Sequence, residues 1–201
     1  MSKMKQKAVF LDRDGVINEI IYHKEMGIID SPFTVEQFIL LPEVSNAINR
    51  FHNQGFKVIL ISNQPGIAKD HFDMAIFEKI REKMKIELAK TSANLDAEYY
   101  CFHHPEAKID KYKKICNCRK PKPGMILQAA RELDIDVSKS WMIGDGINDI
   151  EAGLTAGCKT ILIGRMKCDL CKILEDKGIE PDFIVENLYK ASFITEKEER
   201  T

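Results

Sequence analysis

The sequence contains little that would place this protein at a membrane or on a nucleic acid. No apolar run approaches the roughly 18 to 20 residues that a helix needs to cross a bilayer. The 30 Lys and Arg residues are balanced by 31 Asp and Glu residues, so no surplus of positive charge exists to attract nucleic acid or anionic lipid. The first apolar stretch covers only Ala8 to Leu11, whereas a secretory signal needs about 7 to 15 apolar residues. We therefore expect a cytoplasmic protein without a nucleic-acid or membrane partner.

The chain also lacks internal repeats, low-complexity segments and an interdomain linker. Its 201 residues, 44% of them hydrophobic and 30% charged, fit one globular domain. We expect this domain to cover residues 1–194 and to work as a monomer. The charged end, residues 195–201, is expected to be a frayed tail.

Short apolar runs alternate with amphipathic helical patterns along the chain. Strands are predicted at residues 7–12, 56–62, 97–103, 140–144, 160–164 and 182–185. Helices are predicted at residues 42–54, 73–90, 123–133 and 148–156. This alternation predicts an α/β fold with a doubly wound parallel sheet of the Rossmann-like type. Two long connections, 18–41 and 104–122, follow predicted strands, where such a sheet forms its ligand crevice.

Polar side chains follow the first two predicted strands. Asp12 and Asp14 are two positions apart, so an extended chain directs both carboxylates to the same side. Two like charges this close favour a cation between them, and oxygen ligands suit Mg²⁺. Ser62, Asn63 and Gln64 offer a hydroxyl and two amides for phosphate oxygens. Each feature taken alone is equally explained by an ordinary solvated turn.

Two further polar features appear in the second half of the chain. Asp145 and Asp149 follow the predicted strand 140–144, and Arg119 and Lys120 precede a predicted helix. Alone, the acids are explained by a helix N-cap and the cations by a solvated loop. Together with the earlier acids, behind these strands and in this order, they indicate one shared site.

This order of motifs resembles the haloacid dehalogenase superfamily of phosphotransferases over about residues 7–165. The resemblance implies that Asp12 attacks phosphorus to form an aspartyl-phosphate, and that Asp14 acts as the general acid and base. It also implies Mg²⁺ held by Asp12, Asp145 and the backbone carbonyl of Asp14. Ser62 and Lys120 would stabilise charge on the transferred phosphoryl group.

A second set of residues has the composition of a metal site. Three thiols and one imidazole come from two short segments and suit a closed tetrahedral zinc site, which would be structural. The set is Cys101, His103, Cys116 and Cys118. His104 competes with His103 for the imidazole position, and the family pattern favours His103. The alternatives are buried cysteines without metal, or a redox pair. Zinc would fix the loop 101–118, which delivers Arg119 and Lys120.

The zinc-loop sequence narrows the resemblance. C-x-H-H-P and C-x-C-R-K-P-x-P-G-M, after D-R-D-G-V-I-N and S-N-Q-P-G-I-A, are similar to the heptose bisphosphate phosphatase family. Its members remove the C7 phosphate of a heptose 1,7-bisphosphate and lack an inserted cap domain. The resemblance implies that Arg119 contacts the substrate beyond the transferred phosphoryl group. It also implies that a loop covers the sugar, formed by Ile20, Ile21, Tyr22 and His23.

Two departures from the family leave the substrate open. Gly146 stands where a lysine is frequent in the family, and Cys168 and Cys171 stand in a segment unlike it, interpreted as two cysteines on a helix face. Histidinol phosphate or another small sugar phosphate is the alternative substrate. A phospho-receiver domain is the alternative from another class, but Asp14 would hydrolyse the phosphoryl group that a receiver must keep. A silent zinc-stabilised interaction module would not need the intact acidic set.

Overall fold

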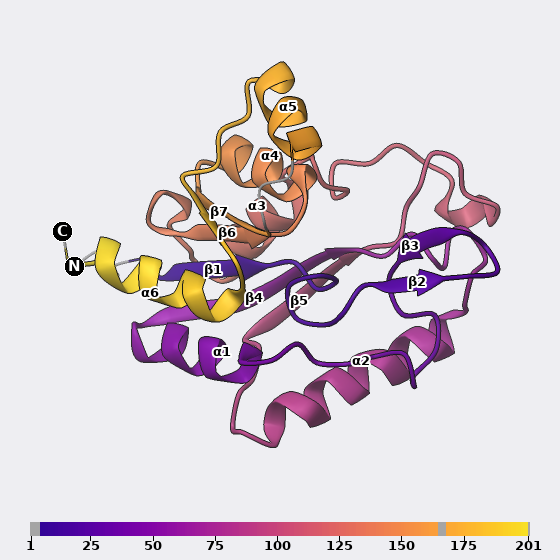
Figure 1. The fold of residues 1–201 in the computed structure, drawn as a ribbon, viewed down its shortest axis with the longest axis horizontal. Helices are drawn as coiled ribbons and strands as arrows, with labels where there is room; N and C mark the ends of the chain where they lie inside the picture. Colours follow the sequence, from indigo (N-terminus) through magenta and orange to yellow (C-terminus); the bar gives the residue numbers. More distant parts are fainter. Residues whose placement is uncertain (1–4, 165–167, 201) are drawn as a thin grey trace.

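The computed structural model describes residues 5–164 and 168–200, and for residues 168–172 it describes the backbone alone. Within these ranges, six strands form one sheet in the order β5-β4-β1-β6-β7-β8 (Figure 1). These are β1 (Lys7–Leu11), β4 (Phe56–Asn63), β5 (Ala97–Cys101), β6 (Trp141–Gly144), β7 (Lys159–Ile163) and β8 (Phe183–Val185). Every neighbouring pair is parallel. The predicted α/β fold with a doubly wound parallel sheet is confirmed.

Helices cover both faces of the sheet (Figure 1). One face carries α1 (Val44–Asn53), α2 (Met74–Ala89) and α6 (Leu188–Glu198), and the other carries α3 (Gly124–Glu132), α4 (Ile147–Ala156) and α5 (Cys168–Lys177). Side chains alternate between the faces along each strand. In β1, Val9 and Leu11 pack against α1 and α6, while Ala8 and Phe10 face α3 and α4. Burial on both faces explains why the strands are near-continuous apolar runs.

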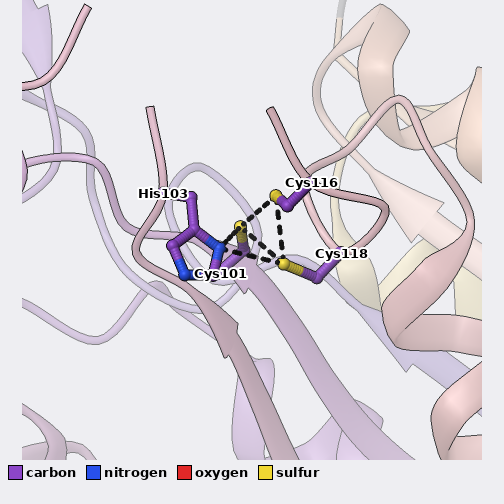
Figure 2. Close-up of side chains that lie close together, drawn as sticks. All are labelled: Cys101, His103, Cys116 and Cys118. Atoms are coloured by element: carbon purple, nitrogen blue, oxygen red, sulfur yellow. Dashed lines mark hydrogen bonds between the residues drawn. The ribbon is translucent and has the colours of Figure 1, made fainter. Parts of the chain in front are cut away.

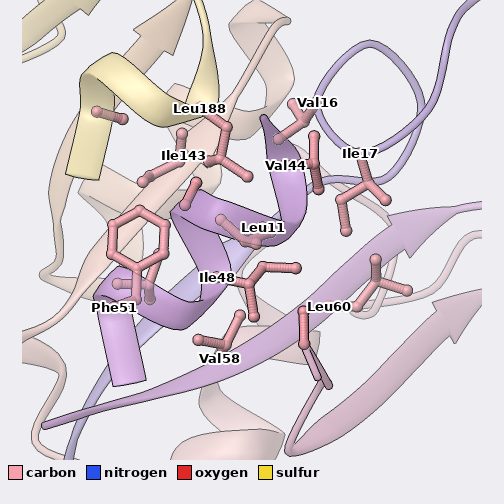
Figure 3. Packing of buried hydrophobic residues seen from close by; sticks show 14 of the residues in the cluster. Leu11, Val16, Ile17, Val44, Ile48, Phe51, Val58, Leu60, Ile143 and Leu188 are labelled. Carbon is pink, nitrogen blue, oxygen red and sulfur yellow. The ribbon is translucent and has the colours of Figure 1, made fainter. Parts of the chain in front are cut away.

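The larger core cluster lies under α1, α2 and α6. Figure 3 shows Ile48 and Phe51 of α1 packed against strand residues and against Leu188 of α6. Phe51 and Ile48 are fully buried. Burying a side chain of this size contributes about 1.5–3 kcal/mol relative to leaving it in water. This packing fixes the sheet whose carboxyl edge carries the polar residues.

Helix α6 was not predicted, and the expected frayed tail is wrong for its last turn. The helix continues to Glu198, and Thr195 is fully buried. The Thr195 hydroxyl donates to Gln54 Oε1 at 2.7 Å. The buried positions Leu188, Ala191, Ser192 and Thr195 have helical spacing, but two of them are polar, so the apolar periodicity is weak.

The connection 18–41 contains a short antiparallel hairpin, β2 (Ile21–His23) and β3 (Ile28–Asp30). Gly27 makes the turn with a φ of +65°, a conformation that glycine adopts without a steric penalty. Two 3-10 turns, Asp110–Tyr112 and Val137–Lys139, complete the secondary structure of the described residues. In the described part of the chain, no helix is both long and apolar enough to cross a membrane.

Candidate active site

A pocket of about 380 Å³ opens at the carboxyl edge of the sheet. The predicted residues on its wall are Asp12, Asp14, Ile20, Asn63, Arg119, Lys120, Asp145 and Asp149. They come from the ends of β1, β4 and β6, the start of α4, the loop before α3 and, for Ile20, the residue before β2. Neighbouring parallel strands therefore bring residues from across the chain to one place, as the sequence predicted.

Lys120 is buried between two carboxylates. Its Nζ lies 2.8 Å from Asp12 Oδ1 and 2.6 Å from Asp149 Oδ1, and it donates to the Ile61 carbonyl at 3.0 Å. Burial alone would lower the pKa of Lys120, but the charges of Asp12 and Asp149 outweigh it and raise the pKa above its ordinary value. The lysine therefore remains a cation at neutral pH, beside the predicted nucleophile.

Three carboxylates form a candidate metal site. Asp12, Asp145 and Asp149 each offer an oxygen, and these atoms lie within 4.8 Å of one another. Burial, with the charges of Asp149 and Asp14, raises the pKa of Asp12 to about 6 against the effect of Lys120. Burial, then the charges of Asp12 and Asp149, raises the pKa of Asp145 to about 8. One lysine does not offset three acids, so the set fits a hard divalent cation such as Mg²⁺.

The carboxylate of Asp14 belongs to a different network. Its Oδ1 accepts from Arg13 Nη2 and from Asn18 Nδ2, both at 3.0 Å, and its Oδ2 accepts from Gln64 Nε2 at 2.7 Å. The structure thus groups Asp149, rather than the Asp14 side chain, with Asp12 and Asp145. The family resemblance groups Asp149 with Asp145 in one motif but does not assign Asp149 to the metal.

The polar residues at the end of β4 and directly after it hydrogen-bond to other residues of the site. Gln64 is fully buried, and its amide also donates to Ser62 Oγ at 3.0 Å, so the expectation that this amide binds phosphate is not met. Asn63 Oδ1 accepts from the backbone N–H of Lys120 at 3.0 Å, and Asn63 Nδ2 donates to the Lys120 carbonyl at 3.1 Å. Asn63 therefore holds the backbone that carries the buried lysine. Ser62 is buried beside them.

Glycines allow the chain segments to approach closely at this edge. Gly15 has a φ of +84°, and a Cβ there would lie 2.1 Å from Asp145 Oδ2. A Cβ at Gly144 would lie 2.2 Å from that of Asp149. Gly146 is the N-cap of α4, and its N–H donates to Asp149 Oδ2 at 3.0 Å. Gly15 and Gly144 thus leave room for Asp145 and Asp149.

The second predicted metal set is brought together in the loop after β5 (Figure 2). His103 Nδ1 lies 3.3 Å from Cys118 Sγ, and Cys101 Sγ lies 3.6 Å from Cys116 Sγ. Cys118 Sγ lies 3.1 Å from Cys101 Sγ and 3.2 Å from Cys116 Sγ, so the three thiols and the imidazole converge on one point, as the ligands of a closed zinc site do. His104 instead accepts a hydrogen bond from the Glu106 N–H through its Nδ1. The arrangement suits zinc and favours His103 over His104.

Arg119 lines the pocket directly after the last cysteine of this set. Its Nη1 donates to the His103 carbonyl at 3.4 Å, so the folded loop helps to hold the guanidinium. Cys168 and Cys171 lie in α5, but their side chains are outside the described residues. The interpretation of these two cysteines therefore stays a prediction.

Of the four residues expected to form a loop over the sugar, only the first lies on the pocket wall. Ile20 lines the pocket, whereas Tyr22 is 59% exposed and His23 stacks on Phe33 with ring centroids 3.7 Å apart. Ile21 is not on the pocket wall. The returning strand contributes residues that sequence reasoning missed. These are Ile29, Asp30 and Ser31. Two apolar pairs around a turn glycine were the available signal for this hairpin.

The parallel sheet, the Asp12–Asp14 pair after its first strand, and the carboxylates around a buried lysine define a hydrolase of the haloacid dehalogenase (HAD) class. In agreement, a family model described as HAD-hydrolase-like matches residues 117–191.

Similar proteins narrow this class. The chain is 43% identical over 158 residues to D-glycero-beta-D-manno-heptose-1,7-bisphosphate 7-phosphatase of Photorhabdus laumondii, covering 79% of this chain and 80% of that protein. The protein of the same name from Pasteurella multocida is 39% identical over 184 residues, covering 91% and 93%. The crystal structure of D,D-heptose 1,7-bisphosphate phosphatase from B. bronchiseptica, complexed with magnesium and phosphate, matches with a TM-score of 0.77 and 32% identity, covering 96% and 99%.

The chain therefore belongs to the heptose 1,7-bisphosphate 7-phosphatase family of HAD hydrolases. It is a phosphatase, which confirms the family resemblance predicted from the sequence motifs. This result favours the enzyme over the receiver domain and over the silent interaction module.

Proposed function

We propose that this protein removes the C7 phosphate from D-glycero-beta-D-manno-heptose 1,7-bisphosphate. The substrate is supported by the names of its relatives. The main structural support for the proposed reaction is that two carboxylates on one pocket wall have different hydrogen-bonding partners. Asp12 is paired with buried Lys120, and Asp14 is held by Arg13 and two amides. Different surroundings suit different roles, as in other sites that use two acids.

Asp12 is the nucleophile of the proposed reaction. Its carboxylate oxygen attacks phosphorus, an aspartyl-phosphate forms, and the bond between phosphorus and the C7 oxygen breaks. Asp14, carrying a proton, gives it to the leaving alkoxide. Asp14 then takes a proton from water, the water oxygen attacks phosphorus, and inorganic phosphate leaves as Asp12 is restored.

Charge stabilisation comes from the groups around the phosphoryl oxygens. Lys120 remains a cation and lies beside Asp12, so it offsets negative charge as the bond to phosphorus forms. Ser62 lies at the same strand end and is proposed to donate to a phosphoryl oxygen. Mg²⁺, held by Asp12 and Asp145 with Asp149 beside them, would reduce the repulsion between nucleophile and phosphate.

The remaining parts of the site bind and position the substrate. Arg119 is proposed to bind the phosphate that stays on the sugar, and zinc at Cys101, His103, Cys116 and Cys118 to hold the loop that carries Arg119. We propose that the enzyme acts as a monomer. The grouping of three cysteines in a candidate metal site supports a reducing compartment, and we propose the cytoplasm.

Phosphate release with Mg²⁺ from four substrates tests this function. The substrates are the α and β anomers of heptose 1,7-bisphosphate, histidinol phosphate and fructose 1,6-bisphosphate. We expect the β anomer to be preferred by about 100-fold in kcat/KM, which equals about 2.7 kcal/mol of differential transition-state binding.

Asp12→Asn is the blank for this assay, because it lacks the nucleophilic carboxylate. Preferred turnover of histidinol phosphate would contradict the substrate assignment and leave the phosphatase mechanism in place. Full activity of Asp12→Asn would contradict the mechanism itself.

A further inference from the structure

We propose that Asp30, at the end of β3, determines substrate specificity by accepting hydrogen bonds from hydroxyl groups of the sugar. This inference deepens the proposed function and rests on it. Asp30 lines the same pocket as Asp12 and Asp14 but is separate from the carboxylate trio that can hold a metal. It reaches the pocket from the hairpin, a segment that contributes none of the reacting groups.

The charges on the pocket wall decide which part of the substrate Asp30 can face. Among the described residues lining the pocket, the cations are Lys120 and Arg119. Lys120 is engaged with Asp12 and Asp149, which leaves Arg119 for a second phosphate. An additional carboxylate repels phosphate, but it can accept two hydrogen bonds from neighbouring hydroxyls. Asp30 therefore suits the hydroxyl-bearing part of a sugar bisphosphate.

The carboxylate is held in place by its own strand end. Asp30 Oδ1 accepts from the Ser31 N–H at 2.7 Å, and Asp30 pairs with Ile21 across the hairpin. The next carbonyl, that of Ser31, lies 2.9 Å from His23 Nε2. An acid that only contacts solvent needs no such support. The local bonds instead give the side chain a fixed direction, which a specificity residue requires.

Packing anchors the hairpin to the domain. Phe33, three residues after Asp30, stacks on His23 at 3.7 Å and contacts the rings of His71 and Phe72 at 4.6 and 5.7 Å. Phe33 belongs to a buried cluster with Phe72 and Phe77, in the segment that follows β4. This segment directly follows Asn63, the last residue of β4, which holds Lys120. Asp30 and the reacting groups are thus positioned by connected parts of one framework.

Kinetics on two kinds of substrate test the proposal. Asp30→Ala should lower kcat/KM for the heptose bisphosphate about 10- to 100-fold, because hydrogen bonds to a charged acceptor are lost. It should leave kcat/KM for p-nitrophenyl phosphate, which has no sugar hydroxyls, within about twofold. Asp30→Asn keeps an acceptor for the Ser31 N–H, so it should show the same selectivity with a smaller loss. Glu25→Gln, in the exposed turn of the same hairpin, is the matched control and should change neither value.

Each outcome separates the proposal from the proposed function. Equal losses of kcat/KM on both substrates would overturn the Asp30 proposal, because Asp30 would then act on the catalytic centre or on the fold. A lowered melting temperature of the variant would indicate an effect on the fold. No loss on either substrate would also overturn it. If the unmodified enzyme prefers another sugar phosphate, the proposed substrate is wrong. The Asp30 proposal is then tested by measuring the same variants on that sugar phosphate. An enzyme that hydrolyses only phosphates without hydroxyls would overturn both.

Discussion

Two acidic residues separated by one position have different neighbours here, and the two roles proposed for them rest on that difference. Asp12 has a buried ammonium at 2.8 Å, whereas Asp14 receives a guanidinium and two amides. The side chains that create this difference are themselves buried: Arg13 is 1% exposed and Gln64 is fully buried. The pattern D-x-D in the sequence fixes the separation of the acids, but only the fold fixes their partners.

Asn63 is expected to act on catalysis through Lys120. Asn63→Ala removes both hydrogen bonds to the Lys120 backbone, so kcat/KM for p-nitrophenyl phosphate should fall about 10-fold. In a Lys120→Ala background the same substitution should have little further effect, which a double-mutant cycle measures. Asn49→Ala, far from the pocket and bonded to the Thr91 carbonyl, is the control. Fully additive losses would show that Asn63 acts independently of the lysine.

At the scale of elements, we expect the loop 101–118 to depend on the four side chains of its candidate zinc site. Within the loop, one short 3-10 turn is the only helix or strand that the structure describes, and Ile115 is 81% exposed. Phe102, Ala107 and Tyr112 pack against the domain, but most other side chains of the loop are polar, so we expect it to need another source of order. A metal joining its two ends would supply that order and keep Arg119 at the pocket.

Cys116→Ser is expected to release zinc and loosen the loop. A loss of about 3 kcal/mol would lower the melting temperature by about 6–12 °C for a domain of this size. Zinc content, limited proteolysis within 101–118 and kcat/KM should all change together. Cys158→Ala, at a buried cysteine outside the loop, should keep the zinc. Unchanged metal content in Cys116→Ser would contradict the assigned ligands.

The elements that could be predicted from the sequence were those with an unambiguous periodicity. The strands β1 and β4 are apolar on both faces, and polar residues at their ends, Asp12 after β1 and Asn63 in β4, line the pocket. Helix α6 escaped prediction because Ser192 and Thr195 occupy its buried face. Asp30 could not be assigned to the pocket either, since its position depends on how Phe33 packs. Such contacts join distant segments and leave no local pattern.

At the scale of the whole molecule, the acidic trio links parts of the chain that are far apart in sequence. Asp12 follows β1, Asp145 follows β6, and Asp149 lies in α4. Bringing these like charges together opposes folding, and a cation bound only by the folded state would reverse that effect. Mg²⁺ bound by these three acids should therefore stabilise the folded protein.

Thermal unfolding with and without Mg²⁺ measures this link. At a concentration 100 times the Kd, Mg²⁺ should stabilise the protein by about 2.7 kcal/mol and raise the melting temperature by about 5–11 °C. Asp145→Asn should abolish this increase, yet without Mg²⁺ it should be at least as stable as the unmodified protein, because repulsion is reduced. Destabilisation of the variant in Mg²⁺-free buffer would contradict this account.

Global stability should also depend on pH through Asp96, which joins α1, β4 and β5. Burial raises the pKa of Asp96, but hydrogen bonds from Lys57, the Val58 N–H and His52 outweigh it and lower the pKa below its ordinary value. A lowered pKa in the folded state gives stability that is present above the unfolded pKa of about 3.9 and lost as pH falls through the folded value.

Asp96→Asn should therefore lower the free energy of unfolding at pH 7 by about 1–3 kcal/mol. The difference from the unmodified protein should shrink below about pH 4, where the carboxyl becomes protonated. Urea denaturation across this pH range measures the effect. A difference that stays constant down to pH 3 would contradict the assignment.

The end of α6 lies beside the start of β1 (Figure 1), where the Lys7 ammonium pairs with the Glu199 carboxylate. A second pair, Lys159 Nζ to Glu198 Oε2 at 2.9 Å, ties the same helix end to the start of β7. Both contacts lie at the amino edge of the sheet, and the pocket opens at the carboxyl edge. A tether, label or solid support attached through either end of the chain is thus kept away from the pocket mouth. An immobilised enzyme should accordingly remain accessible to its substrate.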